Sequence, residues 1–224
     1  MKIKIPYKYI CVEGNIGAGK TSLCEMLAND FSCNLILEEF AENPFLEYFY
    51  KDPARYAFTV ELFFLTERQK QLQATVTQNE LFSDFSLADY SLIKSMLFAR
   101  QNLQAEEFKL FQKIFNTLSQ QIPRPDLILY LHRPIDNLKQ HITDRGRSYE
   151  MNMDVNYLEA VQNSYFDFFK TQTIIPVLVL DAEHLDFINN PWVYAWMVVG
   201  LLHTNCCSKG TRNLLALSRN SLYL

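Results

Sequence analysis

Apolar and polar positions alternate along most of this chain with two different periods, and the alternation predicts an order of strands and helices. Residues 7–14 (YKYICVEG) are rich in aromatic and β-branched residues and end in a glycine, as a strand before a tight loop does. Residues 20–31 (KTSLCEMLANDF) repeat with the helical period and place Leu23, Met26 and Leu27 on one side. The chain therefore begins with a strand, a loop and a helix.

The same two periods continue to about residue 182. Further strands are predicted at 34–40, 80–90 (with its exit loop), 123–132 and 176–182. Helices are predicted at 52–72, 91–101, 105–121, 134–144 and 154–170, the first with Asp52 as N-cap and Pro53 at its first position. Strands that alternate with helices favour right-handed crossovers, so we predict an α/β fold with a five-stranded parallel sheet flanked by helices.

The end of the chain follows neither period. Residues 204–224 have weak periodicity, and we expect a tail of uncertain order after a single domain at 1–203. The apolar stretch 192–202 (WVYAWMVVGLL) is too short to span a bilayer, and the first ten residues lack the apolar run of a signal peptide. We therefore expect no membrane association.

Composition narrows the choice of partners and compartment. Hydrophobic residues make up 49% of the 224 residues and charged residues 21%, which is ordinary for a globular protein. A net charge of -4 provides no general field for a nucleic acid polymer. The five cysteines are odd in number and form no C-x-x-C pair, so we expect reduced thiols in a cytoplasmic protein. They are Cys11, Cys24, Cys33, Cys206 and Cys207.

The loop after the first strand carries the clearest chemical signal. Gly14, Gly19, Lys20 and Thr21 complete the pattern G-x-x-x-x-G-K-[ST], which wraps backbone N–H groups around phosphate oxygens. In such a loop the lysine reaches the outer phosphates and the threonine hydroxyl binds Mg²⁺. The expected nucleotide-binding residues are Gly14, Asn15, Ile16, Gly17, Ala18, Gly19, Lys20, Thr21 and Ser22. Hydrolysis, switching and phosphoryl transfer all use this loop, so it does not name the reaction.

A candidate for the acceptor side follows the second strand. Glu38 lies where open α/β sheets keep their sites, and a carboxylate there could take the proton from an attacking hydroxyl. Taken alone, Glu38 could equally be a solvated acidic residue at a strand end.

Longer segments give Glu38 a context. Residues 38–72 (EEFAENPFLEYFYKDPARYAFTVELFFLTERQKQL) resemble the deoxynucleoside kinase family, closest to its bacterial deoxyadenosine/deoxyguanosine kinase branch. Similar matches at 88–99, 125–131, 145–150 and 157–165 follow in the family's order. The resemblance implies a P-loop kinase-type fold with an arginine lid, and phosphorylation of a deoxynucleoside 5′-hydroxyl by ATP with Mg²⁺. It also implies a homodimer.

The resemblance implies roles for the residues that match the family's motifs. Glu38 corresponds to the catalytic base, and Tyr50 and Glu150 correspond to the pair that holds the sugar 3′-hydroxyl. Arg145 and Arg147 correspond to the lid arginines that reach the transferring phosphate, joining Lys20 in catalysis. Without the family, the turn that carries these two arginines would read as a solvated basic turn.

The sequence departs from the family pattern after the third strand. Many members have an acidic residue followed by arginine there, whereas this chain has Asp89 followed by Tyr90. Asp89 can still help Thr21 to hold Mg²⁺, and Lys94, one helical turn on, is our candidate for the lost positive charge. Asp84 is an alternative match for the acidic position.

A second departure concerns the base of the substrate. Glu61 stands where many members place a glutamine that pairs with the base. An ionised glutamate only accepts hydrogen bonds, which favours guanine with its two adjacent donors, whereas a protonated or water-bridged Glu61 would tolerate adenine as well. We predict a purine deoxynucleoside as substrate and leave the base open.

Two other classes of function remain as alternatives. A nucleoside monophosphate kinase shares the loop and lid but needs extra basic residues for an acceptor phosphate, and charges between Glu38 and Leu72 are mostly acidic. A P-loop binding or switch protein without a small-molecule acceptor is the other. It would normally carry an aspartate after an apolar strand, where this chain has His132 and Arg133.

Overall fold

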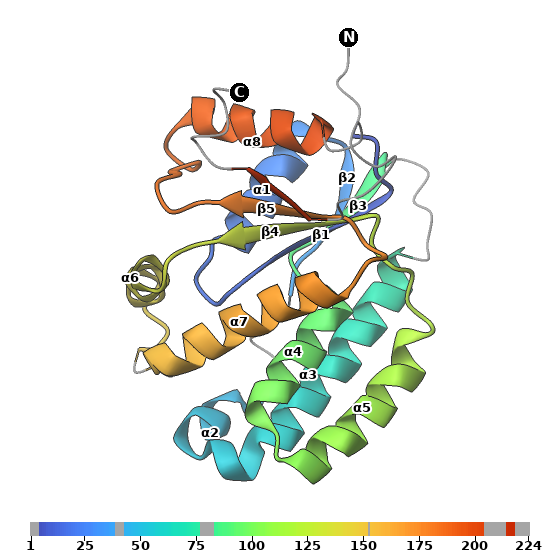
Figure 1. Ribbon diagram of the computed structural model, residues 1–224, viewed down its shortest axis with the longest axis vertical. Helices are drawn as coiled ribbons and strands as arrows, with labels where there is room; N and C mark the ends of the chain where they lie inside the picture. Colours follow the sequence, from blue (N-terminus) through green and yellow to red (C-terminus); the bar gives the residue numbers. More distant parts are fainter. Residues whose placement is uncertain (1–4, 39–42, 77–82, 152, 204–213, 218–224) are drawn as a thin grey trace.

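A parallel sheet with helices on both faces forms the protein (Figure 1). This computed structural model describes residues 5–38, 43–76, 83–151, 153–203 and 214–217. The sheet has six strands in the order β2-β3-β1-β4-β5-β6, and every neighbouring pair is parallel. The α/β class and the parallel sheet predicted from the sequence are confirmed.

The five predicted strands are all present, some shorter than expected. The strands are β1 (Tyr9–Gly14), β2 (Cys33–Ile36), β3 (Phe85–Ala88), β4 (Leu127–His132), β5 (Val177–Asp181) and β6 (Leu214–Leu217). The last of these was not predicted, because it lies within 204–224, where a tail was expected, and four residues show too little periodicity. The remaining residues of that segment lie outside the described part of the chain.

Eight helices connect or follow the strands in the described residues. They are α1 (Lys20–Asp30), α2 (Leu46–Lys51), α3 (Pro53–Val76), α4 (Leu92–Asn102), α5 (Ala105–Ser119), α6 (Ile135–Arg145), α7 (Val155–Thr171) and α8 (Pro191–His203). Pro53 opens α3 as predicted, and Asp52 lies at the predicted N-cap position, with its carbonyl accepting from the N–H of Tyr56 (3.2 Å). Asp52 is also the C-cap of the unpredicted α2, with its N–H donating to the Tyr48 carbonyl. None of these helices combines the length and hydropathy needed to span a bilayer.

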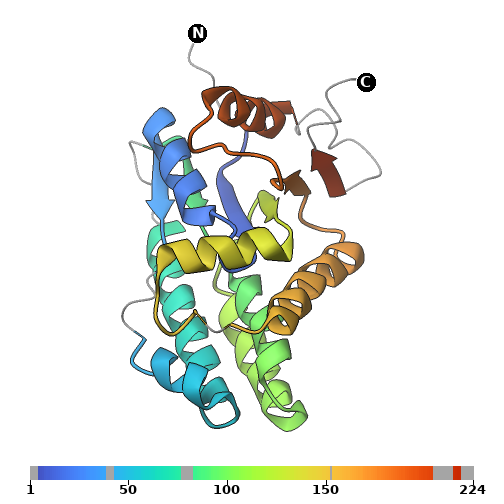
Figure 2. The ribbon, with the colours of Figure 1, turned by 90° about the vertical axis from the view of Figure 1, so that its left-hand side faces the viewer.

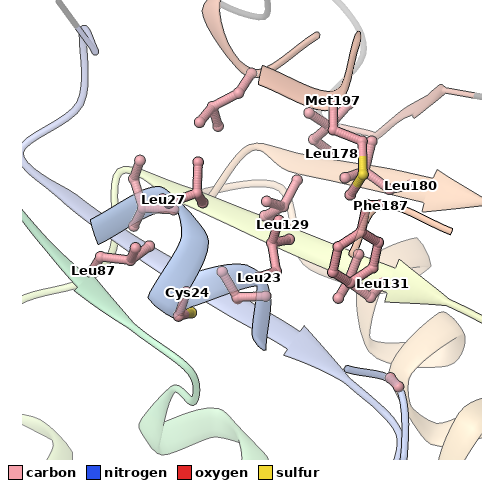
Figure 3. Close-up of a cluster of buried hydrophobic side chains, with 14 of the residues drawn as sticks. Leu23, Cys24, Leu27, Leu87, Leu129, Leu131, Leu178, Leu180, Phe187 and Met197 are labelled. Atoms are coloured by element: carbon pink, nitrogen blue, oxygen red, sulfur yellow. The ribbon is translucent and has the colours of Figure 1, made fainter. Parts of the chain in front are cut away.

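Successive residues of the central strand β1 supply the two faces of the sheet. Ile10 and Val12 belong to a core cluster with α1 and α8, in which Leu23 of α1 lies close to β4 (Figure 3). Tyr9 and Cys11 belong to a second cluster with α3, α4 and α5 on the opposite face. This alternation follows from the two-residue period of a strand. Burial of both faces is what a parallel sheet requires (Figure 1).

The parallel register brings the candidate chemical groups to one edge of the sheet. Cys11 of β1 and Ile36 of β2 both pair with Ala88 of β3, so the segments that follow these strands leave the sheet side by side. They carry the glycine loop, Glu38 and Asp89. Helix α6 lies across this edge, between α1 and the helices of the other layer (Figure 2).

Candidate active site

The glycine loop is shaped by residues with left-handed backbone conformation. Gly17 and Gly19 have φ angles of 79° and 93°, which residues with a Cβ adopt only with strain. Lys20 folds back over the loop and donates hydrogen bonds from Nζ to the carbonyls of Gly14 (3.1 Å) and Asn15 (2.9 Å). Burial, and after it the charge of Lys94, lower the pKa of Lys20 to about 8. An anion bound at this loop would therefore stabilise the charged form of Lys20, which burial disfavours.

Asp89 joins the loop to the segment after β2. Its Oδ2 accepts a hydrogen bond from the Thr21 hydroxyl (2.6 Å), and its Oδ1 accepts one from the backbone N–H of Glu38 (2.8 Å). A hydroxyl and a carboxylate fit Mg²⁺, which takes few protein ligands and completes its shell with phosphates and water. Within the described residues no cluster of three His, Cys, Asp or Glu side chains offers another metal site.

The alternative acidic residue, Asp84, is not part of the site. It precedes β3, and its backbone N–H donates to the Ser32 carbonyl, before β2. Asp84 thus lies at the end of the strands opposite to Asp89, and its side chain is exposed. The alignment that assigns the acidic position to Asp89 is the one that the fold supports.

Glu38 is a buried carboxylate between two cations rather than a solvated strand end. Its side chain is 3% exposed. Arg68 donates from Nε to Oε1 (2.6 Å) and Lys94 donates from Nζ to Oε2 (2.5 Å). Burial alone would raise the pKa of Glu38, but the charges of Arg68 and then Lys94 outweigh it and lower the pKa to about 2. Glu38 is therefore ionised in this arrangement.

One of these cations was suggested by the sequence and the other was missed. Lys94, on α4, lies where we expected a replacement for the family's arginine. Arg68, on α3, also donates from Nη1 to the Ser95 hydroxyl (2.7 Å) and is 4% exposed. The signal that could have identified it is its position: Glu61, Phe64 and Arg68 follow one another at helical spacing on the buried side of α3.

Glu61 is also buried, and its neighbours differ from those of Glu38. Its Oε1 accepts a hydrogen bond from the side-chain amide of Asn102 (2.6 Å), which also donates to the Tyr157 hydroxyl (3.2 Å). Burial raises the pKa of Glu61 to about 7, although the bond from Asn102 and the charge of Arg68 act in the other direction. Glu61 is therefore poised between its two protonation states near neutral pH. Neither Asn102 nor Tyr157 was singled out from the sequence.

The turn after α6 brings the predicted lid and sugar residues together. Arg145 forms an ion pair with Oε2 of Glu150, and Arg147 lies 3.5 Å from its Oε1. Tyr50 stacks on Tyr149, with 5.5 Å between ring centroids. Burial and the charge of Glu150 raise the pKa of the Tyr50 hydroxyl. Glu150 is 4% exposed, so these arginines face a buried acid rather than forming a fully solvated basic turn.

A single cavity of about 510 Å³ connects these groups. The predicted site residues that line it are Ile16, Gly17, Ala18, Gly19, Lys20, Thr21, Ser22, Tyr50, Glu61, Asp89, Arg145, Arg147 and Glu150. Gly14, Asn15 and Glu38 lie behind this wall: the first two contact Lys20, and Glu38 is covered by Arg68 and Lys94, which do line the cavity. The glycine loop thus lines one end of the cavity, and the carboxyl groups of Glu61 and Glu150 line the other.

Side chains that the sequence reasoning left without a role support the loop. Arg133 donates to the carbonyls of Ala18 (3.1 Å) and Ala182 (2.6 Å), which ties the loop to the segment after β5. The ring Nδ1 of His141 lies 2.9 Å from the Gly17 carbonyl oxygen. Arg133, the basic residue after β4, therefore holds the loop in place by hydrogen bonds. P-loop switch proteins typically carry an aspartate after the corresponding strand.

Comparisons with known proteins identify the family to which this chain belongs. The deoxynucleoside kinase family model matches residues 10–201. A deoxyguanosine kinase of Bacillus subtilis is 33% identical over 186 residues, which is 81% of this chain and 90% of that protein. A deoxyadenosine kinase of Lactobacillus acidophilus is 28% identical over 190 residues, covering 81% of this chain and 88% of the relative.

A solved structure extends the likeness to the whole fold. The deoxyadenosine kinase of M. mycoides with bound dCTP superposes with a TM-score of 0.74 at 23% identity, covering 87% of this chain and 98% of that one. Another structure of that enzyme, with the products dCMP and dCDP, also gives a TM-score of 0.74, at 25% identity and covering 86% of this chain and 97% of the other. The chain is a phosphotransferase that belongs to the deoxynucleoside kinase family.

Proposed function

We propose that the protein transfers the terminal phosphoryl group of ATP, with Mg²⁺, to the 5′-hydroxyl of a purine deoxynucleoside. The product would be the deoxynucleoside 5′-monophosphate, as in nucleotide salvage. The observation that carries this proposal is the position of Asp89. Its two oxygens bond the threonine of the phosphate loop and the backbone of the candidate base, Glu38, so donor and acceptor groups converge at one point.

On the donor side, the loop and Lys20 bind the phosphates of ATP. Thr21 and Asp89 would hold Mg²⁺, which would supply positive charge at the transferring phosphoryl group. The Nζ of Lys20 exchanges the carbonyls of Gly14 and Asn15 for phosphate oxygens, and this exchange favours binding because burial otherwise disfavours its charge.

On the acceptor side, Glu38 orients the 5′-hydroxyl and takes its proton. While Arg68 and Lys94 both pair with it, Glu38 is too weak a base for this role. Lys94 is close enough to Lys20 for its charge to lower the pKa of Lys20, so phosphates at the loop also attract Lys94. Donor binding that draws Lys94 away from Glu38 raises the pKa of Glu38 and prepares it as a base.

The lid and the sugar pocket are coupled through Glu150. Arg145 and Arg147 both lie against its carboxylate. Phosphates attract the guanidinium groups, whose planar forks suit phosphate oxygens. Glu150, together with Tyr50, is then available to the sugar 3′-hydroxyl.

The cations near the pocket argue against a phosphorylated acceptor. Arg68 is engaged with Glu38, and the nearby carboxylates of Glu61 and Glu150 would repel a nucleoside monophosphate. An uncharged nucleoside therefore fits better than the acceptor of a monophosphate kinase. From the family resemblance we also propose that the protein is a cytoplasmic homodimer. Size-exclusion chromatography with light scattering would measure its oligomeric state.

Replacement of the proposed base tests this function. ATP consumption is measured with each of the four deoxynucleosides, and we expect it to depend on a purine deoxynucleoside. Glu38→Gln should lower turnover by about 10²- to 10⁴-fold, the usual contribution of a general base, while ATP binding stays close to that of the parent protein. The control is Glu47→Gln, an exposed glutamate on α2. ATP consumption that needs no deoxynucleoside would contradict the proposal.

A further inference from the structure

We propose that Glu61, oriented by Asn102, reads the Watson–Crick edge of the bound purine, and that one proton on Glu61 switches the preference between deoxyadenosine and deoxyguanosine. The inference rests on the proposed function, since it assigns the base specificity of the same site. In it, Asn102 is a positioning residue that acts through Glu61.

The geometry leaves one carboxyl oxygen for a ligand. Glu61 comes from the middle of α3, Asn102 from the end of α4 and Tyr157 from the first turn of α7, and all three line the cavity. Asn102 donates to Oε1, whereas Oε2 takes no hydrogen bond from any residue that the structure describes. Phe64 and Phe98 line the same part of the protein and supply apolar surface for a flat base.

The two protonation states of Glu61 fit different bases. Guanine presents two adjacent donors, N1–H and the N2 amino group, and an ionised carboxylate accepts both. Adenine presents an acceptor at N1 and a donor at the N6 amino group, and a protonated carboxyl offers the complementary donor and acceptor. A mismatched pair leaves a buried polar group without its hydrogen bond, which makes discrimination strong.

The charges around Glu61 keep both states within reach. Arg68 faces it from the same helix and Lys94 from α4, and both favour the ionised form, whereas Glu38 opposes it. Asn102 also favours the ionised form, and Tyr157, whose own pKa burial raises, stays neutral on α7. Against these, burial raises the pKa of Glu61 to about 7. The switch therefore falls in the pH range where both nucleosides are uncharged.

The test is the ratio of kcat/KM for deoxyguanosine to kcat/KM for deoxyadenosine, measured from about pH 6 to about pH 8. The ratio cancels groups that act on both substrates, such as Glu38 and Lys20. If one proton controls the choice, the ratio rises by about tenfold per pH unit through this range. Glu61→Gln should make the ratio independent of pH and favour deoxyadenosine, because an amide offers a donor and an acceptor at every pH.

A matched control and a positioning variant complete the experiment. Glu67→Gln, on the same helix but with a side chain 45% exposed, should keep the pH dependence of the parent protein. Asn102→Ala removes a hydrogen bond that favours the ionised form, so the pH at which the two kcat/KM values are equal should move upward. A merely structural role for Asn102 would lower both values without moving that pH.

Each result decides the matter. A ratio that stays flat with pH in the parent protein, or one that still varies in Glu61→Gln, overturns the inference while leaving the kinase function intact. If Asn102→Ala does not move the pH at which the two kcat/KM values are equal, Asn102 does not position Glu61. Failure to phosphorylate any deoxynucleoside at any pH would refute the proposed function itself, and the inference with it.

Discussion

At the scale of single residues, the site contains two buried carboxyl groups whose pKa values are shifted in opposite directions by their surroundings. Glu38 and Glu61 are both almost fully buried, yet the pKa of one is lowered to about 2 and that of the other is raised to about 7. The difference comes from partners: Glu38 touches two cations, whereas Glu61 touches a neutral amide. Two carboxyl groups of one pocket can therefore take different tasks at the same pH.

This difference predicts how stability depends on pH. The folded-state pKa of Glu61 lies above its ordinary value of 4.5, so the folded protein binds more protons between these values and loses stability as pH rises from 4.5 to 7. Glu61→Gln should therefore change the free energy of unfolding little at about pH 5. Above pH 7 it should raise the free energy of unfolding of the ligand-free protein by up to about 3 kcal/mol. Urea unfolding at both pH values measures it.

Two comparisons test whether the raised pKa of Glu61 causes this change in stability. Glu67→Gln, half-exposed on α3, should change stability little at either pH. Glu38 should behave in the opposite sense, since its lowered pKa contributes stability above its ordinary value that is lost as pH falls toward 2. A Glu61→Gln protein that is less stable than the parent at about pH 8 would show that Glu61 is ionised without cost.

Residue types were predictable where one motif fixes them, and were missed where the partner is distant in sequence. Lys20 and Thr21 follow from the glycine loop alone. Arg68 and Asn102 do not, because they meet Glu38 and Glu61 only after separate helices pack together. A charged residue on the buried side of a long helix is the one signal in the sequence, and it does not name the partner.

At the scale of elements, the phosphate loop is held in place by close contact with α6. A Cβ added to Gly17 would lie 2.9 Å from the Leu138 carbonyl oxygen and 3.1 Å from the Ile142 side chain. Helix α6 ends at Arg145, so the same helix that packs on the loop carries one of the two proposed lid arginines (Figure 2). The position of the proposed lid therefore depends on the absence of a side chain at Gly17.

Substitution of two glycines separates backbone strain from this contact. Gly146, the C-cap of α6, has a φ of 70° and nothing within 4 Å of an added Cβ, so Gly146→Ala should cost about 1–2 kcal/mol from strain alone. Gly17→Ala carries similar strain and must also displace α6, which adds about 1–3 kcal/mol. Denaturant unfolding compares the two variants. Equal losses would mean that α6 yields without cost.

Elements were predictable in proportion to their length and periodicity. Helix α7 and strand β4 lie within one or a few residues of their predicted bounds, because each keeps one period throughout. Helix α2 has six residues, too few to show a period, so only the helix that follows Asp52 was predicted. Strand β6 has four residues and is defined by its pairing with β5.

At the scale of the whole molecule, the site and the last strand occupy different parts of the sheet. The loop, Glu38 and Asp89 follow strands β1, β2 and β3, whereas β6 pairs with β5 at the far edge. The residues that line the cavity end at Ile188. The groups proposed to carry out the chemistry and the strand β6 therefore lie at different parts of the sheet.

Removal of residues 204–224 tests whether 1–203 is a sufficient domain, as the sequence predicts. The truncated protein keeps five strands and both helical layers, so we expect it to fold and to retain the kcat/KM of the full chain for its preferred deoxynucleoside. Loss of the four register pairs between β5 and β6 should lower the free energy of unfolding by a few kcal/mol, at about 1 kcal/mol per backbone hydrogen bond. It should also promote association through the exposed edge of β5. Steady-state kinetics, urea unfolding and light scattering measure the three effects, and a folded truncation without activity would show that the segment contributes to the site.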